Sequence, residues 1–452
     1  MKPKKTDFQG RIFETPLNEI INMEHPLVIL ASRMDWASLE EIFGKLYVPH
    51  HGRPGLPTRL MVGLHYLKYA FNHSDESAVE TFLENPYWQY FCGQEYFVHD
   101  LPLDPSSMTR WRKRLNKNDS EALLKETIQT ALRMNVMKPK EVSRVNVDTT
   151  VQEKAVAYPT DARNYNKGRK LLVKIAKKRG IELRQSYVRL GEKLLRQQAR
   201  YAYARQMKRS AKATKQLRTY LGRVIREMDS SSEKLTKREN EILALVKRLH
   251  AQKREDKNKV YSVHAPEVEC IAKGKAHKKY EFGCKASVVS TNGTNWIVGA
   301  DACHGIPYDG HTLAQAVSQV KRLTGSEVHE VYCDKGYRLK KEEVPEGFRM
   351  LLPGGSKRNA SEKKRMKRRN AIEPIIGHMK SDHRLSRNYL RGILGDVCNV
   401  ILAACGFNMR KLLRAFLYLQ FRSFWRSFLS MRCIIKDALL RKNPILSLNF
   451  CP

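Results

Sequence analysis

The chain has 452 residues and a formal net charge of +37, from 83 Lys plus Arg against 46 Asp plus Glu. An excess of this size favours a polyanionic partner, nucleic acid ahead of an anionic membrane surface, although a basic surface can also serve solubility alone. Hydrophobic residues make up 42% of the chain, which excludes a disordered basic tail and predicts two or three domains with buried cores.

The ends of the chain argue against secretion and membrane insertion. Residues 1–9 contain lysines but no apolar stretch followed by small residues, so they do not form a secretory signal, and a cytoplasmic protein is expected. The apolar stretches 397–407 and 412–435 are short or interrupted by arginines. Because a membrane-spanning helix needs about 20 apolar residues with few charges, amphipathic helices packed on the protein body are predicted, with an interfacial membrane role as the weaker alternative.

The nine cysteines predict neither disulfides nor a zinc site. Their number is odd and no CxxC pair occurs, so a disulfide framework is not expected. The neighbours Cys303 and His304, and the pair His277 and Cys284, have spacings that fit no standard pattern of zinc ligands.

The first part of the chain has helical periodicity. Apolar residues recur on one face of residues 59–71, a second helix is predicted at 77–83, and further helices are expected to begin at Ser106 and Ser120. A helical N-terminal DNA-binding domain is therefore predicted at 1–137. The candidate N-caps and stops of these helices are Ser74, Ser106, Asn72 and Gly93.

The pattern changes to that of a strand near residue 142, where a second domain begins. Val145 and Val147 alternate with polar neighbours, which is the period of a β-strand. Residues 164–256 then contain no proline and hold 27 Lys or Arg against 9 acidic residues. We expect a basic helical hairpin or bundle at 167–258, inserted in the second domain, with its turn at 229–232.

Strands and helices alternate in the rest of the chain, which predicts an α/β core. The second domain is expected to span 142–415, followed by a helical C-terminal tail at 416–452. Its later elements are expected as a hairpin of strands at 278–290 and 296–300 joined by a turn at 291–293, a helix at 312–323, a buried strand at 328–333 and a basic helix at 361–385.

Three acidic residues lie where such a core would expose them: Asp148 on the first strand, Asp334 after a later strand, and Glu373 on the basic helix. The carboxyl edge of an open α/β sheet is where ligand sites are found. Each acid alone is also typical of a turn or a helix cap. Together in a basic domain, three carboxylates suit two Mg²⁺ ions about 4 Å apart, which can activate a water or a 3′-hydroxyl.

The motifs around these acids resemble those of DDE-type transposases of bacterial insertion sequences, in the grouping of families four and five. The segments Val147-Asp148-Thr149-Thr150 and Asp334-Lys335-Gly336-Tyr337 are similar to the first two acidic blocks of that family. The third block has Tyr, two residues, Arg, three residues, Glu, six residues and Lys. Here Arg369, Glu373 and Lys380 match, and Met366 replaces the tyrosine, a residue that usually contacts the DNA end. The resemblance covers about residues 35–411.

The resemblance implies an RNase H-like, integrase-like catalytic core and a helical N-terminal domain. It implies that Asp148, Asp334 and Glu373 bind two Mg²⁺ ions, for which Mn²⁺ can substitute. Arg369, Lys380 and Tyr337 would bind DNA. The expected partners are double-stranded DNA, as terminal inverted repeats and as target, and a second copy of the chain, since a homodimer can hold paired ends. Localisation would be cytoplasmic and nucleoid-associated, without a membrane.

The spacing of the third block also has a physical meaning. On one continuous helix, Arg369, Glu373 and Lys380 would share a face. Pro374 disfavours helical geometry in the residue before it and is best accommodated in a first turn. A helix start or kink is therefore predicted at Glu373.

Other polar residues are given structural interpretations. Asp301, Asp309 and His311 lie in a loop-rich segment and are interpreted as turn residues. The basic insertion is expected to contact DNA phosphates, with a dimerisation hairpin as the alternative. The N-terminal helices are expected to read the terminal repeats.

Three functions are compatible with these features. The favoured one is a transposase that binds insertion-sequence ends and catalyses metal-dependent DNA cleavage and strand transfer. The alternatives are a metal-dependent nuclease without strand transfer and a non-catalytic DNA-binding protein derived from a transposase. The second alternative is disfavoured because all three acids are present.

Overall fold

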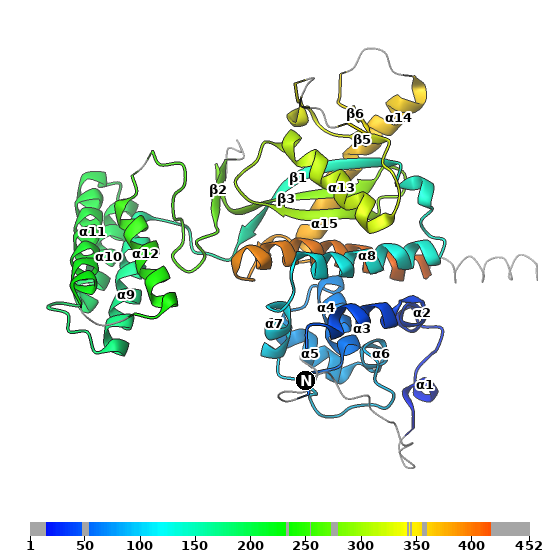
Figure 1. The fold of residues 1–452 in the computed structure, drawn as a ribbon, viewed down its shortest axis with the longest axis horizontal. Helices are drawn as coiled ribbons and strands as arrows, with labels where there is room; N and C mark the ends of the chain where they lie inside the picture. Colours follow the sequence, from blue (N-terminus) through cyan, green and yellow to red (C-terminus); the bar gives the residue numbers. More distant parts are fainter. Residues whose placement is uncertain are drawn as a thin grey trace, which may run out of the picture.

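The computed structural model describes residues 15–47, 54–231, 235–253, 255–272, 279–340, 343, 346–354 and 359–416. Figure 1 shows a mixed sheet with helices, a group of N-terminal helices beneath it, and a separate helical bundle to one side. The predicted α/β fold class is confirmed. The predicted C-terminal tail at 416–452 lies, except for its first residue, outside the described residues.

The N-terminal part is helical, as predicted. Ser74 caps α5 through a capping box, and Asn72 and Gly93 have positive φ angles of 63° and 90° where helices stop. The prediction was wrong at Ser120, because α8 begins three residues earlier behind a capping box at Asn116. The helices are α1 Leu17–Ile20, α2 Pro26–Arg33, α3 Trp36–Gly44, α4 Thr58–Ala70, α5 Asp75–Glu84, α6 Pro86–Phe91, α7 Ser106–Arg112 and α8 Lys117–Arg133.

Within the described ranges, seven strands form one mixed sheet with β1 at its centre. β1 pairs antiparallel with β3 on one side and parallel with β5 on the other, and β6 continues the sheet parallel to β5. Beyond β3 lie β4 and β2, and β7 pairs with the end of β1. The strands are β1 Arg144–Lys154, β2 Glu269–Ala272, β3 Tyr280–Thr291, β4 Ile297–Cys303, β5 Glu330–Tyr332, β6 Arg349–Leu351 and β7 Arg387–Asn388.

A glycine allows the long strands β1 and β3 to approach each other at one end. A Cβ added to Gly283 would lie 1.9 Å from the carbonyl oxygen of Gln152, which no side chain tolerates. The residue therefore fixes how β3 crosses the end of β1, near the point where the chain leaves for the helical insertion.

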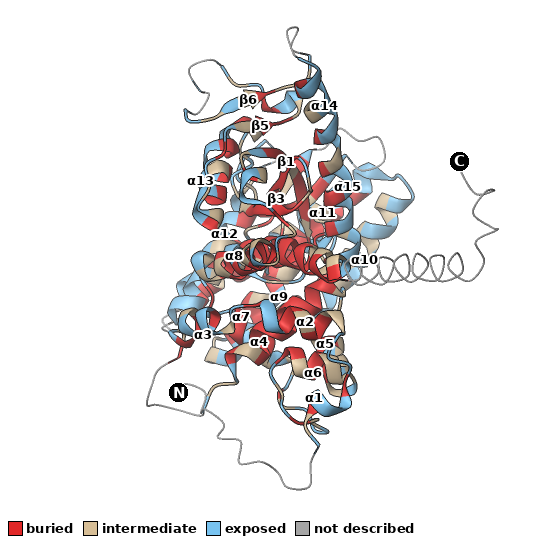
Figure 2. Cartoon of the chain, turned by 90° about the vertical axis from the view of Figure 1, so that its right-hand side faces the viewer, coloured by how far each residue is buried: buried red, intermediate tan, exposed pale blue. Residues whose placement is uncertain are grey.

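Helices cover the sheet and connect it to the N-terminal part. α13 (Leu313–Thr324) packs on β4, while α14 (Ala360–Arg368) and α15 (Ile372–Asp382) follow β6. The helix Gly392–Phe416 and α8 lie between the sheet and the N-terminal helices (Figures 1 and 2). One hydrophobic core runs through the sheet, α8, α13, α15, the helix Gly392–Phe416 and the N-terminal helices.

The helix Gly392–Phe416 is the one helix among the described residues that is long and apolar enough to cross a membrane. However, 78% of its apolar window is buried in the protein, as the prediction of a helix packed on the protein body requires. A Cβ added to Gly406 would lie 2.5 Å from the carbonyl oxygen of Tyr69 on α4. The glycine thus allows this helix to touch the N-terminal part directly.

The basic insertion is a bundle with its own hydrophobic core, separate from the main one. It has four helices instead of a simple hairpin. α11 ends at Ser230, within the predicted turn at 229–232, of which the structure describes residues 229–231. Further breaks occur at Gly180 and Arg205, both with positive φ. The helices are α9 Asp161–Arg179, α10 Val188–Tyr203, α11 Met207–Ser230 and α12 Lys237–Ala251.

Candidate active site

The register of the sheet brings Asp148 and Asp334 to the same level. In the parallel pair of β1 and β5, Val145 lies opposite Val331 and Asn146 opposite Tyr332. Two residues further along each chain the positions are 148 and 334. Asp148 lies within β1, the first strand, as predicted from the sequence. It lies beyond the end of the shorter neighbouring strand β5, where the sheet edge opens.

Asp334 is held by the turn that follows β5. Its side chain accepts a hydrogen bond of 2.8 Å from the backbone N–H of Gly336 and caps the short helix η3 (Lys335–Tyr337). A Cβ added to Gly336 would lie 3.0 Å from this carboxylate. The glycine in the Asp-Lys-Gly-Tyr motif therefore leaves room for the carboxylate at the sheet edge.

Asp148 is electrostatically perturbed. The pKa of Asp148 is raised to about 6, first by burial and then by the neighbouring carboxylates of Asp334 and Asp309. A hydrogen bond of 2.8 Å from the backbone N–H of Thr149 and the charge of Arg369 act in the opposite direction. A half-buried carboxylate among other carboxylates is the arrangement that a bound cation relieves.

Asp309 was interpreted from sequence as a turn residue, and it does begin the short helix η2 (Asp309–Thr312). It also belongs to the acidic cluster. Its carboxylate accepts hydrogen bonds of 2.7 Å from Thr149 and 2.9 Å from Lys285. Thr149 follows Asp148 directly, so a common network orients both acids. Lys285 lies on β3, the strand that pairs with β1. A lysine within a strand was the sequence signal that could have indicated an acidic partner such as Asp309.

Asp301 was also interpreted as a turn residue, and this was wrong, because Asp301 lies within β4 and pairs in register with Ser287 of β3. Asp301 is buried, forms an ion pair with Lys117 of α8 and accepts a hydrogen bond of 2.7 Å from Gln315. His311 is 58% exposed and lies 3.9 Å from Glu343.

Glu373 lies on a helix that starts where the sequence predicted a start or kink. The short helix η5 ends at Ala371, and α15 begins at Ile372, so that Pro374 falls in its first turn. The side chain of Glu373 is 66% exposed and points away from the core. Its carboxylate pairs with Arg369, which also faces Asp148.

Arg369 lies between Asp148 and Glu373. Its guanidinium is 3.3 Å from the Glu373 carboxylate and 4.0 Å from that of Asp148. The side chain is only 10% exposed, and its Nη1 atom is buried without a hydrogen-bond partner. Unlike a surface phosphate contact, this arginine faces the acids, where it offsets their charge and holds Glu373 on their side of α15.

The two other predicted DNA contacts occupy different environments. Tyr337 is 1% exposed, and burial raises its pKa. This position does not support a direct DNA contact for Tyr337. Lys380 lies half-buried in the last turn of α15.

Hard oxygen ligands dominate the cluster. The charges of Asp334 and Asp309 both act on Asp148, and Arg369 lies between Asp148 and Glu373. Carboxylate oxygens are the ligands that Mg²⁺ and Mn²⁺ prefer. The residues present therefore fit a divalent-metal site at this position.

Comparisons with known families define the class of protein to which this fold and site belong. Residues 15–114 match a family described as a transposase domain (DUF772), and residues 354–413 match a transposase DDE domain. The first range covers the N-terminal helices α1 to α7, and the second contains Glu373. Together, the two matches support a DDE-type transposase.

The chain belongs to the same family as a bacterial relative whose whole length it covers. It is 50% identical over 207 residues to an uncharacterized protein, ORF8 in the nfe locus of Rhizobium meliloti. The match extends over 46% of this chain and 100% of that protein. No solved structure matches the chain.

Proposed function

We propose that the protein cuts insertion-sequence ends and joins them to target DNA, with Asp148, Asp334 and Glu373 as the metal-binding acids. The observation that carries this proposal is the β1–β5 register, which brings the first two acids to one level of the sheet edge. Two Mg²⁺ ions, or Mn²⁺ in their place, would activate the nucleophile and stabilise the leaving oxygen when bound there.

We further propose that the catalytic sheet is RNase H-like and that the protein belongs to the grouping of insertion-sequence families four and five. A long central strand with an antiparallel neighbour on one side and two parallel strands on the other supports the fold assignment. The motif containing Arg369, Glu373 and Lys380 supports the grouping.

The residues of this chain have separate roles in the proposed reaction. Asp148 must be ionised to bind a cation, and Arg369 favours the ionised form. Thr149 and Lys285 fix Asp309, which adds negative charge beside the site. Exposed cations of α14 offer contacts for the phosphates of the DNA end, together with Lys380 in the last turn of α15. They are Lys363, Lys364, Lys367 and Arg368.

The test is magnesium-dependent cleavage and strand transfer on DNA that carries the element's ends. Glu373→Gln should abolish both products and retain DNA binding. Asp382→Asn changes another exposed acid on the same helix, 49% exposed and paired with His378, and should retain both products. Unchanged activity in Glu373→Gln would refute its role. Cleavage without joining by the wild type would favour the nuclease function, and DNA binding without any cleavage would favour the non-catalytic one.

Arg369 offers a second test of the site that needs no DNA. Since its charge lowers the pKa of Asp148, Arg369→Gln should move the midpoint of pH-dependent Mn²⁺ binding upward by about one unit or more. Calorimetric titration over pH measures this midpoint. Arg368→Gln is the matched control, because Arg368 bonds to the backbone carbonyl of Asn292 and not to the acids. An unmoved midpoint in Arg369→Gln would contradict the assigned role.

The insertion is proposed as a clamp on DNA phosphates. Its helices α10 and α11 and the turn between them expose many cations, while the buried apolar residues of α11 belong to the bundle core. Contacts of this kind carry no sequence information and weaken steeply with salt. The exposed cations are Arg189, Lys193, Arg196, Arg200, Arg205, Lys208, Arg209, Lys212, Lys215, Arg223 and Arg226.

Charge reversal tests the clamp. Arg196→Glu with Arg200→Glu should weaken binding to random-sequence DNA and reduce the salt dependence of the binding constant, by about 0.9 in log–log slope per lost phosphate contact. Lys321→Glu on α13, a lysine that is 63% exposed, controls for net charge. An unchanged slope in the double variant would favour the dimerisation role, which sedimentation of the same protein would then reveal.

We also propose that the protein acts as a homodimer on paired ends and resides in the cytoplasm, associated with the nucleoid. The net charge of +37 supports the association with DNA.

A further inference from the structure

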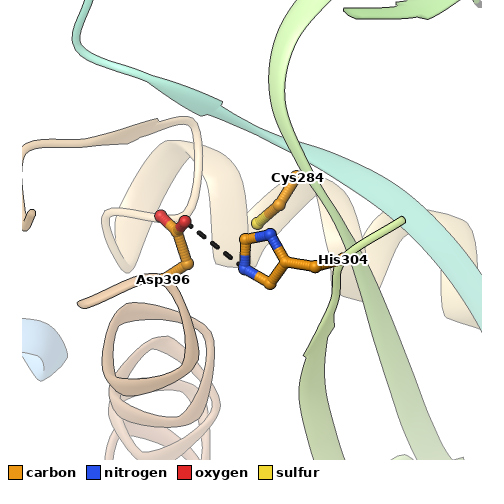
Figure 3. A group of neighbouring side chains, drawn as sticks. All are labelled: Cys284, His304 and Asp396. Atoms are coloured by element: carbon orange, nitrogen blue, oxygen red, sulfur yellow. Dashed lines mark ion pairs between the residues drawn. The ribbon is translucent and has the colours of Figure 1, made fainter. Parts of the chain in front are cut away.

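A second group of metal-ligating side chains lies at the other end of the long strands, next to the root of the insertion. Cys284 of β3, His304 directly after β4 and Asp396 of the helix Gly392–Phe416 point toward one another (Figure 3). Their ligand atoms all lie within 4.8 Å of one another. Cys284 and Asp396 are 1% and 2% exposed. The group shares no residue with the acidic cluster of the active site.

We propose that Cys284, His304 and Asp396 bind a divalent transition-metal ion of the zinc class in a structural site. A thiolate, an imidazole nitrogen and a carboxylate oxygen are the ligand types that zinc accepts. They differ from the all-oxygen set that the catalytic carboxylates offer to Mg²⁺. The fourth position would be filled by water or by a further side chain.

The histidine is oriented for this role. Its Nε2 atom is buried without a hydrogen-bond partner and lies 3.5 Å from Oδ2 of Asp396. Its other nitrogen, Nδ1, lies 4.0 Å from the carboxylate of Glu269 on β2. Metal-binding histidines typically present the second ring nitrogen to a carboxylate, which fixes the tautomer and leaves the first nitrogen for the metal.

The other two ligands are also held by neighbours that leave one atom facing the centre. Lys154 and Asn388 donate hydrogen bonds of 2.7 and 2.6 Å to Oδ1 of Asp396, so that Oδ2 faces His304. Gln152 donates a hydrogen bond of 3.5 Å to the sulfur of Cys284. Each of the three ligands therefore has an orienting partner.

The charges around the site favour a cation. Lys154 bonds to Glu267 at 2.8 Å as well as to Asp396, so one buried lysine offsets two buried carboxylates. Glu269 adds a third carboxylate, and one of its oxygens is buried without a hydrogen-bond partner. With His304 neutral and Cys284 as a thiol, two negative charges remain. Metal binding would displace the thiol proton and add a third negative charge, of which a divalent ion would offset two.

The geometry requires only a small adjustment. Zinc bond lengths of about 2.0–2.3 Å place tetrahedral ligands roughly 3.5 Å apart, so the widest separation in the group must shrink by about 1 Å. Side-chain rotation can supply this. A bound ion would then join β3, β4 and the helix Gly392–Phe416 where the chain enters the insertion.

The test uses full-length protein dialysed against Co²⁺ and, separately, against Zn²⁺. Cobalt bound to a cysteine gives a thiolate charge-transfer absorption that the catalytic carboxylates cannot produce. We expect this absorption in the wild type and its loss in Cys284→Ser. Cys303→Ser is the matched control, because Cys303 precedes His304 and pairs in register with Lys285 instead of facing Asp396. It should retain the absorption.

Stability provides the second measurement. Zinc should raise the melting temperature of the wild type and of Cys303→Ser, and should have no such effect on His304→Gln. Circular dichroism before dialysis verifies that each variant is folded. Absence of the thiolate absorption in the wild type, or an equal zinc effect on His304→Gln, would overturn the proposal and leave an ion pair of His304 with Asp396.

Discussion

Replacing Asp148, the first of the proposed metal-binding acids, by asparagine should stabilise the protein while removing the proposed activity. Burial, followed by the charges of Asp334 and Asp309, raises the pKa of Asp148 from 3.8 to about 6. A carboxyl group whose pKa is higher in the folded state favours folding below about pH 4, and this contribution is lost as the pH rises through 6. One pKa unit corresponds to about 1.4 kcal/mol. The ionised side chain, 19% exposed, therefore costs up to about 3 kcal/mol at pH 7.5.

Urea unfolding of Asp148→Asn and wild type without divalent ions measures this cost. The variant should gain about 2–3 kcal/mol in the free energy of unfolding at pH 7.5 and nearly nothing at pH 4. Added Mg²⁺ should reduce the gain, since the ion binds the wild type more tightly. Asp301→Asn, which loses a buried ion pair with Lys117, should instead destabilise. A loss of stability in Asp148→Asn, or a gain independent of pH, would refute the electrostatic reasoning.

Two further predictions concern the N-terminal part. Gly406→Val should lower the free energy of unfolding by about 1–3 kcal/mol, because its side chain would meet the backbone of Tyr69. Gly377→Ala, with no atom within 4 Å of the added Cβ, should have little effect, and equal urea midpoints for the two variants would contradict the close approach. Asp75→Asn should cost about 3–5 kcal/mol at pH 7, because it leaves two buried cations unpaired. Burial alone would raise the pKa of Asp75, but these two cations hold it well below its usual range. The ion pairs therefore stabilise the protein at neutral pH, and this stabilisation is lost as the pH falls below about 4. Unfolding measured over an acid titration checks this.

Local sequence signals predicted the elements whose causes are local. Pro374 indicated the helix start at Glu373, and the helix start lies at Ile372. Ser74 likewise indicated the start of α5, because an N-cap acts on the backbone of the next few residues and can be recognised from the local sequence. The start of α8 was missed because Asn116 competed with Ser120 as a cap, and both are ordinary N-cap candidates.

The site was less accessible to sequence because its geometry depends on strand register. Neighbouring residues do not reveal that Asp148 and Asp334 meet, since this follows from pairing of strands almost 190 positions apart. Asp309 joins them through a loop of ordinary turn composition. The Cys284 and Asp396 side chains were missed as partners because zinc patterns in sequence rely on closely spaced ligands, whereas these come from separate elements.

The separate core of the insertion divides the chain into two parts that tolerate change independently. The buried apolar residues of the bundle form one hydrophobic core, and they are not part of the second core, which packs the sheet and the N-terminal helices. Evolution can therefore lengthen, recharge or replace the bundle without repacking the sheet. If the bundle is the DNA clamp proposed above, changes in DNA binding can accumulate there while the acidic site at the sheet edge is preserved.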